Sequence, residues 1–201
     1  MRSSYGVKVV LLFLVNIAFY LQNLLFLPLF SRALGLEMYG VWSQISAALN
    51  LLATLVLLGL PGAFTRFSAG EGDSHVVAKN YYTALQFIVM TGLVVAALLY
   101  GSSGLLSRVF IRAGTEVVGL VQVSCLLLLA QILSRYSITY FSTFQRARAY
   151  SVFRLAQPLM TICSAVVVLS LGFGLAETIV SFAAVHLSIF AVSQYLIIRE
   201  I

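Results

Sequence analysis

Long apolar stretches recur along this chain, and they restrict its fold more than any other feature of the sequence. A segment of about 20 residues with few charges can cross the hydrocarbon core of a bilayer as an α-helix. With 61% hydrophobic and only 9% charged residues, the chain is also too poor in charge for a soluble globular domain, which carries about 25%. We predict six spans, at Val9–Phe30, Val41–Leu60, Tyr82–Leu106, Val117–Phe141, Val152–Leu171 and Thr178–Ile198.

The sequence therefore predicts an all-α, polytopic membrane protein, in which residues 1–201 form a single bundle of six transmembrane helices. The segments between the spans are rich in glycine, charge and small polar residues, as connections should be. We expect loops at SRALGLEMYG, TRFSAGEGDSHVVAKN, RVFIRAGTE, QRARAY and GFGLAE.

The Lys and Arg residues are unevenly divided between the two sides of the predicted membrane. Cytoplasmic loops are enriched in Lys and Arg. With a cytoplasmic N-terminus, that side would hold eight of the 12, namely Arg2, Lys8, Arg66, Lys79, Arg146, Arg148, Arg154 and Arg199. Arg32, Arg108 and Arg112 would lie opposite, and Arg135 within a span. We therefore expect both termini in the cytoplasm. We also expect the net charge of +6 to face anionic membrane lipid rather than nucleic acid.

Polar residues recur at helical spacing within four of the spans, so that each of these helices has one polar stripe. In packed membrane helices such residues form interhelical hydrogen bonds, which is the simpler explanation for a single Ser or Thr. Alternatively, the stripes converge on a hydrated cavity. The stripes are Asn16, Tyr20 and Asn23; Ser46, Asn50 and Thr54; Ser124, Gln131, Arg135, Thr139 and Ser142; and Arg154, Gln157, Thr161 and Ser164.

Arg135 has two explanations. An arginine at the centre of a span costs about 2.5 to 3.5 kcal/mol, so its side chain either extends to the membrane surface or binds a partner in a watery cavity. No acidic residue lies within the spans to pair with it. An anionic ligand is then the natural candidate, and the predicted substrate-binding residues are Arg135, Arg154, Arg66, Gln131, Asn50, Asn16, Asn23 and Gln157. We expect no catalytic residue, metal site or cofactor.

Two segments resemble a known family. LPLFSRALGLEMYGVW, Leu27–Trp42, resembles the junction of the first two helices in bacterial oligosaccharide flippases, a polysaccharide-biosynthesis branch of the superfamily that includes multidrug and toxin extruders. LGLPGAFTRF, Leu58–Phe67, resembles the Gly-rich end of the second helix in that family, followed by a basic residue, Arg66. The first pattern consists of Pro28, Arg32, Leu34, Gly35, Tyr39 and Gly40.

These residues also have structural interpretations that need no family. Gly35 after Leu34 suits the end of a helix. Arg32, Tyr39 and Trp42 lie where a membrane interface is expected.

The resemblance implies a transporter that moves a lipid-linked oligosaccharide, carried on undecaprenyl pyrophosphate, across the bacterial inner membrane for lipopolysaccharide, O-antigen or other surface polysaccharide synthesis. Two bundles of a 12- to 14-helix protein would rock about a cationic cavity. Because this chain ends after six spans, we expect it to be the N-terminal half of such a transporter. The other possibility is a half-transporter that dimerises. Polysaccharide polymerase machinery is a further candidate partner.

Two other functions fit part of the sequence. A drug and toxin extruder would have the same bundle, but its cationic substrates favour acidic residues inside the membrane. A rhomboid-like intramembrane protease would use the serine of GSSG, Ser103, together with His186. The GSSG tetrapeptide closes a predicted span rather than opening a helix, which argues against that pairing.

Overall fold

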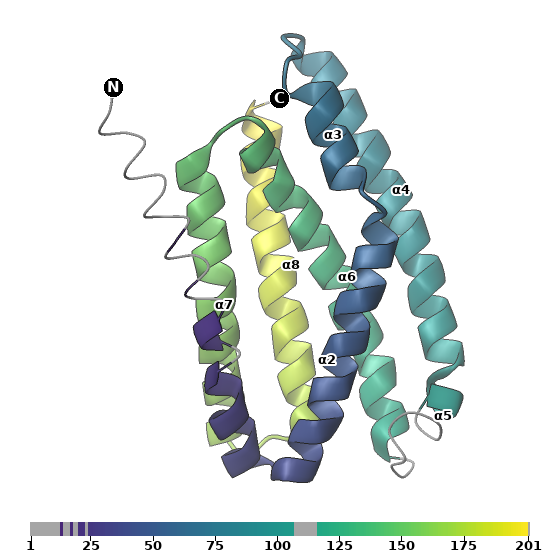
Figure 1. Cartoon of the computed structure of the whole chain (residues 1–201), viewed down its shortest axis with the longest axis vertical. Helices are drawn as coiled ribbons and strands as arrows, with labels where there is room; N and C mark the ends of the chain where they lie inside the picture. The colour runs from purple at the N-terminus through teal and green to yellow at the C-terminus, as the bar shows by residue number, and fades with distance from the viewer. Residues whose placement is uncertain (1–12, 14–16, 18–19, 23, 107–115, 201) are drawn as a thin grey trace.

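A computed structural model describes residues 13, 17, 20–22, 24–106 and 116–200, and these residues form helices and turns without any strand. Figure 1 shows long helices that run side by side and alternate in direction. Helical residues 24–33 are followed by α2 (Leu36–Leu57), α3 (Leu60–Ser68), α4 (Ser74–Gly101), α5 (Ser103–Leu106), α6 (Glu116–Thr143), α7 (Ala147–Ser170) and α8 (Leu175–Glu200).

Five stretches of helix among the described residues are long and apolar enough to cross a membrane. They are Leu36–Ser68, which joins α2 and α3, and the helices α4, α6, α7 and α8. They correspond to the second to sixth predicted spans. Most of the first predicted span, Val9–Phe30, lies outside the described residues. The all-helical membrane architecture is therefore confirmed for five spans, while a second lobe stays a prediction.

Helix α6 is the centre of the bundle. It is the most buried of the five apolar helices, and it contacts α2, α3, α4, α5, α7 and α8. Its packing against α4 is close at Gly92, where an added Cβ would lie only 2.4 Å from Cδ1 of Ile132. Polar residues on α6 therefore have neighbours from several helices within reach.

The second predicted span is interrupted rather than closed at Leu60. Leu58 and Gly59 adopt left-handed backbone conformations, with φ of 41° and 75°, and α3 then begins with Pro61 in its first turn. Proline is favoured there because a first-turn residue needs no backbone N–H partner. The predicted loop at Thr65–Asn80 is thus wrong over most of its length, because Thr65–Ser68 belong to α3 and Ser74–Asn80 to α4.

Helix α3 is stabilised by side-chain contacts that a hydropathy pattern cannot predict. The hydroxyls of Thr65 and Thr143 are 2.9 Å apart, which links α3 to the end of α6. Phe64 is buried, and its ring packs against those of Tyr81, Tyr136 and Tyr140. These contacts explain why a segment predicted as loop is helical.

The third predicted span is displaced along the chain. Helix α4 begins at Ser74 instead of Tyr82, because Oδ1 of Asp73 accepts a hydrogen bond from the backbone N–H of His75 at 2.9 Å and caps the helix. It ends at Gly101, and Ser102 separates it from the short α5. The predicted end at Leu106 was therefore too late.

The junction before α2 follows the sequence interpretation in part. Gly35 has a φ of 87°, as expected for glycine at the end of a helix. Trp42, however, is only 7% exposed, and its ring lies against those of Phe30 and Phe182. Trp42 therefore joins α2 to α8 and to helical residues 24–33, and its position at a membrane interface stays a prediction.

The two ends of the bundle differ in charge. One end, which we name the Arg146 end, contains the end of α3, the start of α4, the turn from α6 to α7 and the end of α8 (Figure 1). The described basic residues near this end are Arg66, Lys79, Arg146, Arg148, Arg154 and Arg199. Arg32 lies toward the opposite end, which we name the Gly172 end after the turn from α7 to α8. The predicted grouping of basic residues is therefore present, although the side of the membrane stays a prediction.

Candidate functional site

A polar cavity of about 250 Å³ lies in the half of the bundle nearer the Arg146 end. Helices α2, α3, α6 and α7 all contribute to its wall. The lining residues are Leu57, Pro61, Arg135, Ile138, Thr139, Ser142, Tyr150, Arg154 and Gln157. The cavity thus brings together three of the predicted substrate-binding residues from two separate polar stripes.

Arg135 and Arg154 reach the same cavity because α6 and α7 form an antiparallel hairpin. Arg135 lies eight residues before the end of α6 at Thr143, and Arg154 lies seven residues after the start of α7 at Ala147. At 1.5 Å per residue, these positions are about 12 and about 10 Å from the turn. The hairpin therefore places both guanidinium-bearing residues at nearly the same depth.

Asn50 connects the polar stripe of α2 to that of α6. Its Oδ1 atom accepts hydrogen bonds from the Arg135 guanidinium and from Nε2 of Gln131, the latter at 3.2 Å. Its Nδ2 atom donates to the backbone carbonyl of Ser46 at 2.9 Å, which directs the oxygen toward α6. Two predicted polar stripes meet here through side chains.

The hydroxyls of the stripes behave differently from the amides and arginines. Thr54, Thr139 and Thr161 each donate to a backbone carbonyl four residues earlier in their own helix, as does Ser124. Such bonds satisfy the hydroxyl without joining helices. Asn50, Gln131 and Arg135, in contrast, form hydrogen bonds between helices.

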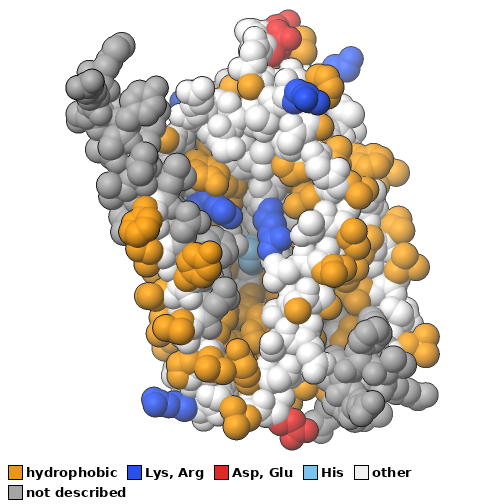
Figure 2. Space-filling view, viewed as in Figure 1, with side chains coloured by type: hydrophobic (Ala, Val, Ile, Leu, Met, Phe, Trp, Pro, Cys, Tyr) orange, Lys and Arg blue, Asp and Glu red, His pale blue; other side chains and the backbone are white. Residues whose placement is uncertain are grey.

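The charge of the cavity is positive. No acidic residue is among those that line it, and Glu200 instead pairs with Arg146 at 3.1 Å near the end of the bundle. Figure 2 shows Lys and Arg side chains on both sides of a hollow in the middle of this face, whereas its acidic side chains lie at the two ends. The Arg154 guanidinium lies 5.8 Å from the ring centroid of Tyr150, within the range of a cation–π contact.

The other predicted site residues are placed differently. Arg66 is exposed in the last turn of α3 and is not among the residues that line the cavity. Asn16 and Asn23 lie outside the described residues. Tyr150, Leu57 and Pro61 line the cavity although they belong to none of the predicted stripes. Tyr150 could have been found from its place one turn before Arg154 on the same helix.

His186 has a partner on the neighbouring helix. Its ring is 6% exposed, and Nδ1 lies 2.8 Å from the hydroxyl of Ser134 on α6. Ser103, the serine considered for a protease, is buried in α5 beyond the end of α4. A nucleophile needs its base within hydrogen-bond distance, and the described bond of His186 goes to Ser134 instead.

No group of three or more His, Cys, Asp or Glu residues that could hold a metal ion occurs in the described part of the chain. The chemistry offered by the cavity is that of two guanidinium groups, the Gln157 amide and the hydroxyls of Thr139, Ser142 and Tyr150. Guanidinium groups present paired N–H donors that match the oxygens of phosphate and carboxylate. The arrangement therefore suits an anionic ligand with further hydrogen-bonding groups.

Comparison with known proteins gives one family. No curated protein and no solved structure matches the chain. A family model described as polysaccharide biosynthesis protein matches residues 6–200, which is nearly the whole sequence and includes every helix described above. The five long apolar helices indicate a multi-pass membrane protein, and the match shows that this chain belongs to the polysaccharide biosynthesis protein family.

Proposed function

We propose that this chain forms one bundle of a flippase that moves lipid-linked oligosaccharide of the undecaprenyl-pyrophosphate type across the bacterial inner membrane. The observation that carries the proposal is the shared cavity of Arg135 and Arg154. The glycan would be destined for lipopolysaccharide, O-antigen or another surface polysaccharide.

The lining of the cavity contains two arginines and no acidic residue, so an anion bound there would offset positive charge. An arginine at the very centre of a span costs about 2.5 to 3.5 kcal/mol, which is an upper limit for these two because they lie closer to one end. Two like charges also repel more strongly as the surroundings become less polar. Pyrophosphate supplies adjacent negative groups whose oxygens can each accept paired N–H donors. Its binding would relieve both costs at once.

The depth of the site fits a substrate that arrives from one leaflet. The two arginines lie about 10 to 12 Å from the turn at the Arg146 end, within one half of a hydrocarbon core about 30 Å thick. Gln131 lies one helical turn farther toward the middle of α6 and shares Asn50 with Arg135. In this proposal the pyrophosphate occupies the arginines, while amides such as Gln131 and Asn50 bind sugar hydroxyls.

A second bundle would complete the path. Asn50 is exposed on α2 in the middle of an apolar helix, and an exposed amide facing lipid would be unfavourable. We propose that a second six-helix bundle, either a C-terminal half or a second copy of this chain, covers this face. Rocking of the two bundles would then expose the arginines to each leaflet in turn.

The test replaces the arginines in the complete transporter and scores surface glycan against the amount of membrane protein. Arg135→Lys should impair export at normal protein levels, because lysine keeps the charge but loses the planar pair of donors. Arg135→Ala and Arg154→Ala should abolish it. Arg148→Ala is the matched control, because it removes a basic residue of α7 that does not line the cavity.

Full export by the Arg135→Lys variant would contradict paired binding of the pyrophosphate and would favour a side chain that only extends to the membrane surface. Equal losses in Arg148→Ala and Arg154→Ala would show that net charge, rather than the cavity, matters.

A further inference from the structure

His186 is a titratable residue inside the apolar helix α8, and it lies next to the cavity of Arg135 and Arg154. Its ring is 6% exposed, and Nδ1 lies 2.8 Å from the hydroxyl of Ser134, the residue directly before Arg135 on α6. Figure 2 shows a histidine side chain in the hollow between the Lys and Arg side chains. The other histidine of the chain, His75, lies in the first turn of α4, at the Arg146 end. Ionisable side chains within membrane helices are rare and mark functional sites by default.

The hydrogen bonds of Ser134 determine which ring nitrogen of His186 can take up a proton. The Ser134 hydroxyl donates to the backbone carbonyl of Gln131 at 3.1 Å. Because a hydroxyl has a single proton, Nδ1–H of His186 then donates to the oxygen of Ser134. In the neutral ring Nε2 therefore carries no proton and is the atom that protonates. Nδ1 stays a donor in both forms, so protonation leaves this hydrogen-bond chain unchanged.

The electrostatic surroundings of His186 are set by the arginines of the cavity. Helix α8 packs against α6 and α7. Among the described titratable residues, Arg135 on α6 is the one whose charge acts on the His186 ring, and Arg154 on α7 acts on Arg135 in turn. Charged residues on α8 and on the other helices that contact it lie nearer the ends of the bundle. These are Arg32, Glu37, Lys79, Arg148, Glu177, Arg199 and Glu200.

An anion in the cavity would therefore change the charge that His186 tolerates. Without the anion, a protonated ring adds a third positive charge near Arg135 and Arg154, and like charges repel strongly in surroundings of low polarity. A bound anion offsets that repulsion, and the hollow gives water, the source of the proton, a path to the ring. If the anion favours protonation of the ring, protonation must favour binding of the anion by the same factor.

We propose that His186 takes up one proton on Nε2 when an anion binds between Arg135 and Arg154, so that the bundle binds the anion and the proton together. This inference rests on the anion site of the proposed function, but it does not depend on which anionic substrate occupies that site.

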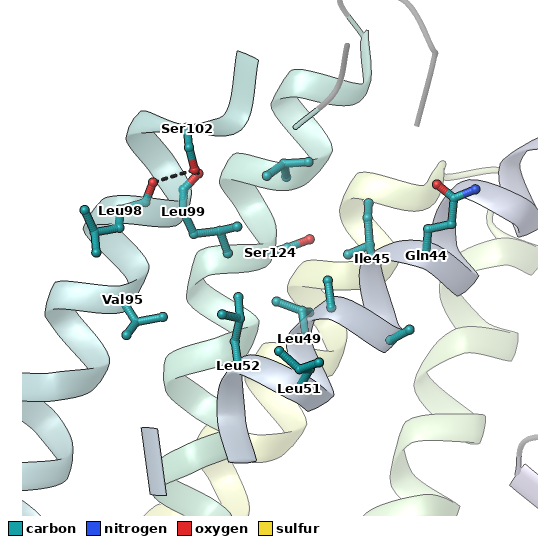
Figure 3. A pocket seen from close by; sticks show the side chains of 13 residues that line it. Gln44, Ile45, Leu49, Leu51, Leu52, Val95, Leu98, Leu99, Ser102 and Ser124 are labelled. Atoms are coloured by element: carbon teal, nitrogen blue, oxygen red, sulfur yellow. Dashed lines mark hydrogen bonds between the residues drawn. The ribbon is translucent and has the colours of Figure 1, made fainter. Parts of the chain in front are cut away.

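The other large pocket of the bundle offers no comparable site. This apolar groove of about 900 Å³ lies between α2 and α4, and Figure 3 shows Leu52 and Leu99 pointing into it. Its lining contains no charged or titratable residue. The Ser102 and Ser124 hydroxyls in its wall donate to backbone carbonyls of their own helices. We therefore expect an inorganic anion to bind at the arginines and not in this groove.

Nitrogen-15 NMR of the histidine ring tests the proposal directly. The chain has two histidines, so His75→Asn leaves His186 as the single source of ring signals. His75 is exposed and does not line the cavity, which makes the variant otherwise neutral. The full chain in detergent micelles is compared with and without sulfate, which stays fully ionised over about pH 5 to 8. We expect the neutral Nδ1–H form without sulfate and the doubly protonated ring at saturating sulfate.

The pH dependence of sulfate binding, measured by calorimetry, gives a second readout. Where the empty ring is neutral and the occupied ring is charged, the Kd of the parent chain should increase about tenfold per pH unit, because one proton binds with the anion. His186→Asn keeps an N–H donor for Ser134 but cannot be protonated, so its Kd should vary little with pH. His75→Asn is the matched control and should keep the dependence of the parent chain.

The outcomes separate this inference from the proposed function. A neutral ring at saturating sulfate, or a parent-like pH dependence in His186→Asn, would overturn the coupling while leaving the anion site intact. Sulfate binding that is absent in the parent chain, or unchanged in Arg135→Ala and Arg154→Ala, would overturn the anion site and the coupling with it. Circular dichroism checks folding, and the NMR arm decides the question even if His186→Asn fails to fold.

Discussion

The guanidinium of Arg135 on α6 donates a hydrogen bond to Oδ1 of Asn50 on α2, and the same oxygen accepts a bond from Gln131. Asn50 is neutral, so it orients Arg135 without cancelling its positive charge. Polar contacts between membrane helices are worth about 0.6 to 2 kcal/mol. The contact therefore adds modest stability and leaves the arginine available to an anion.

This arrangement predicts opposite effects of Asn50→Asp on stability and on transport. A carboxylate at this position would still accept from Arg135, so thermal unfolding in detergent should occur at an unchanged or higher temperature. Its negative charge would, however, compete with an anionic substrate, and export by the proposed flippase should fall strongly. Asn50→Ala should lower stability while retaining more export than Asn50→Asp. Normal export by Asn50→Asp would mean that the charge of Arg135 is not used for binding.

The meeting of Arg135 and Arg154 illustrates what the sequence could predict. Both residues were expected in a substrate site from helical spacing and from the cost of charge in a membrane. Their pairing additionally required the register of the α6–α7 hairpin, which depends on helix ends that hydropathy does not locate. Counting outward from the turn at Phe144–Arg146 would have placed them at the same depth.

Helix ends and the short helix α3 were predicted less accurately than the apolar spans, because hydropathy does not locate helix ends. Hydropathy reports which residues are apolar, whereas the start of α4 depends on the Asp73 cap and α3 on the contacts of Phe64 and Thr65. A signal for α3 was present in Pro61, because proline favours the first turn of a helix. Because Arg66 belongs to α3, its side chain is exposed. Arg66 was predicted to bind substrate, but it does not line the cavity of Arg135 and Arg154.

The close packing of α4 on α6 predicts that Gly92→Ala destabilises the bundle. The new methyl group would lie 2.4 Å from Cδ1 of Ile132, a fully buried side chain. Overpacking of this kind costs about 1 to 3 kcal/mol, against a gain of up to about 1 kcal/mol in helix propensity. Thermal unfolding in detergent should therefore occur at a lower temperature.

Two further variants test the cause. Ile132→Val removes the Cδ1 atom, so it should recover part of the stability lost in Gly92→Ala. Gly119→Ala, on α6, is the matched control, because nothing lies within 4 Å of its new Cβ. A Gly92→Ala variant as stable as Gly119→Ala would mean that the two helices pack less closely than described.

A buried hydrogen-bond chain predicts a second stability effect. Nε2 of Gln194 donates to Oη of Tyr81 and, at 2.9 Å, to the hydroxyl of Ser137, while Tyr81 donates to Ser137 at 3.1 Å. The chain joins α4, α6 and α8. Tyr81→Phe removes the shared hydroxyl and should cost about 1 to 3 kcal/mol of unfolding free energy, because buried partners lose a bond.

Tyr82→Phe is the control for this prediction, because Tyr82 is exposed on the same helix. Combining Tyr81→Phe with Gln194→Leu should cost less than the sum of the two single changes, since both remove the same contact. Strict additivity of the two changes would show that the hydrogen bond contributes nothing measurable.

The division of charge between the two ends of the bundle predicts its orientation in the membrane. Six described basic residues lie near the Arg146 end and Arg32 lies toward the other. Since Lys and Arg accumulate on the cytoplasmic side, reporters fused after Ile201 or inserted between Ala69 and Gly72 should read cytoplasmic. Reporters inserted at Gly172, in the turn from α7 to α8, or at Gly114 should read periplasmic. The opposite pattern would place Arg135 and Arg154 nearer the outer leaflet, and it would contradict the proposed uptake of substrate from the cytoplasmic leaflet.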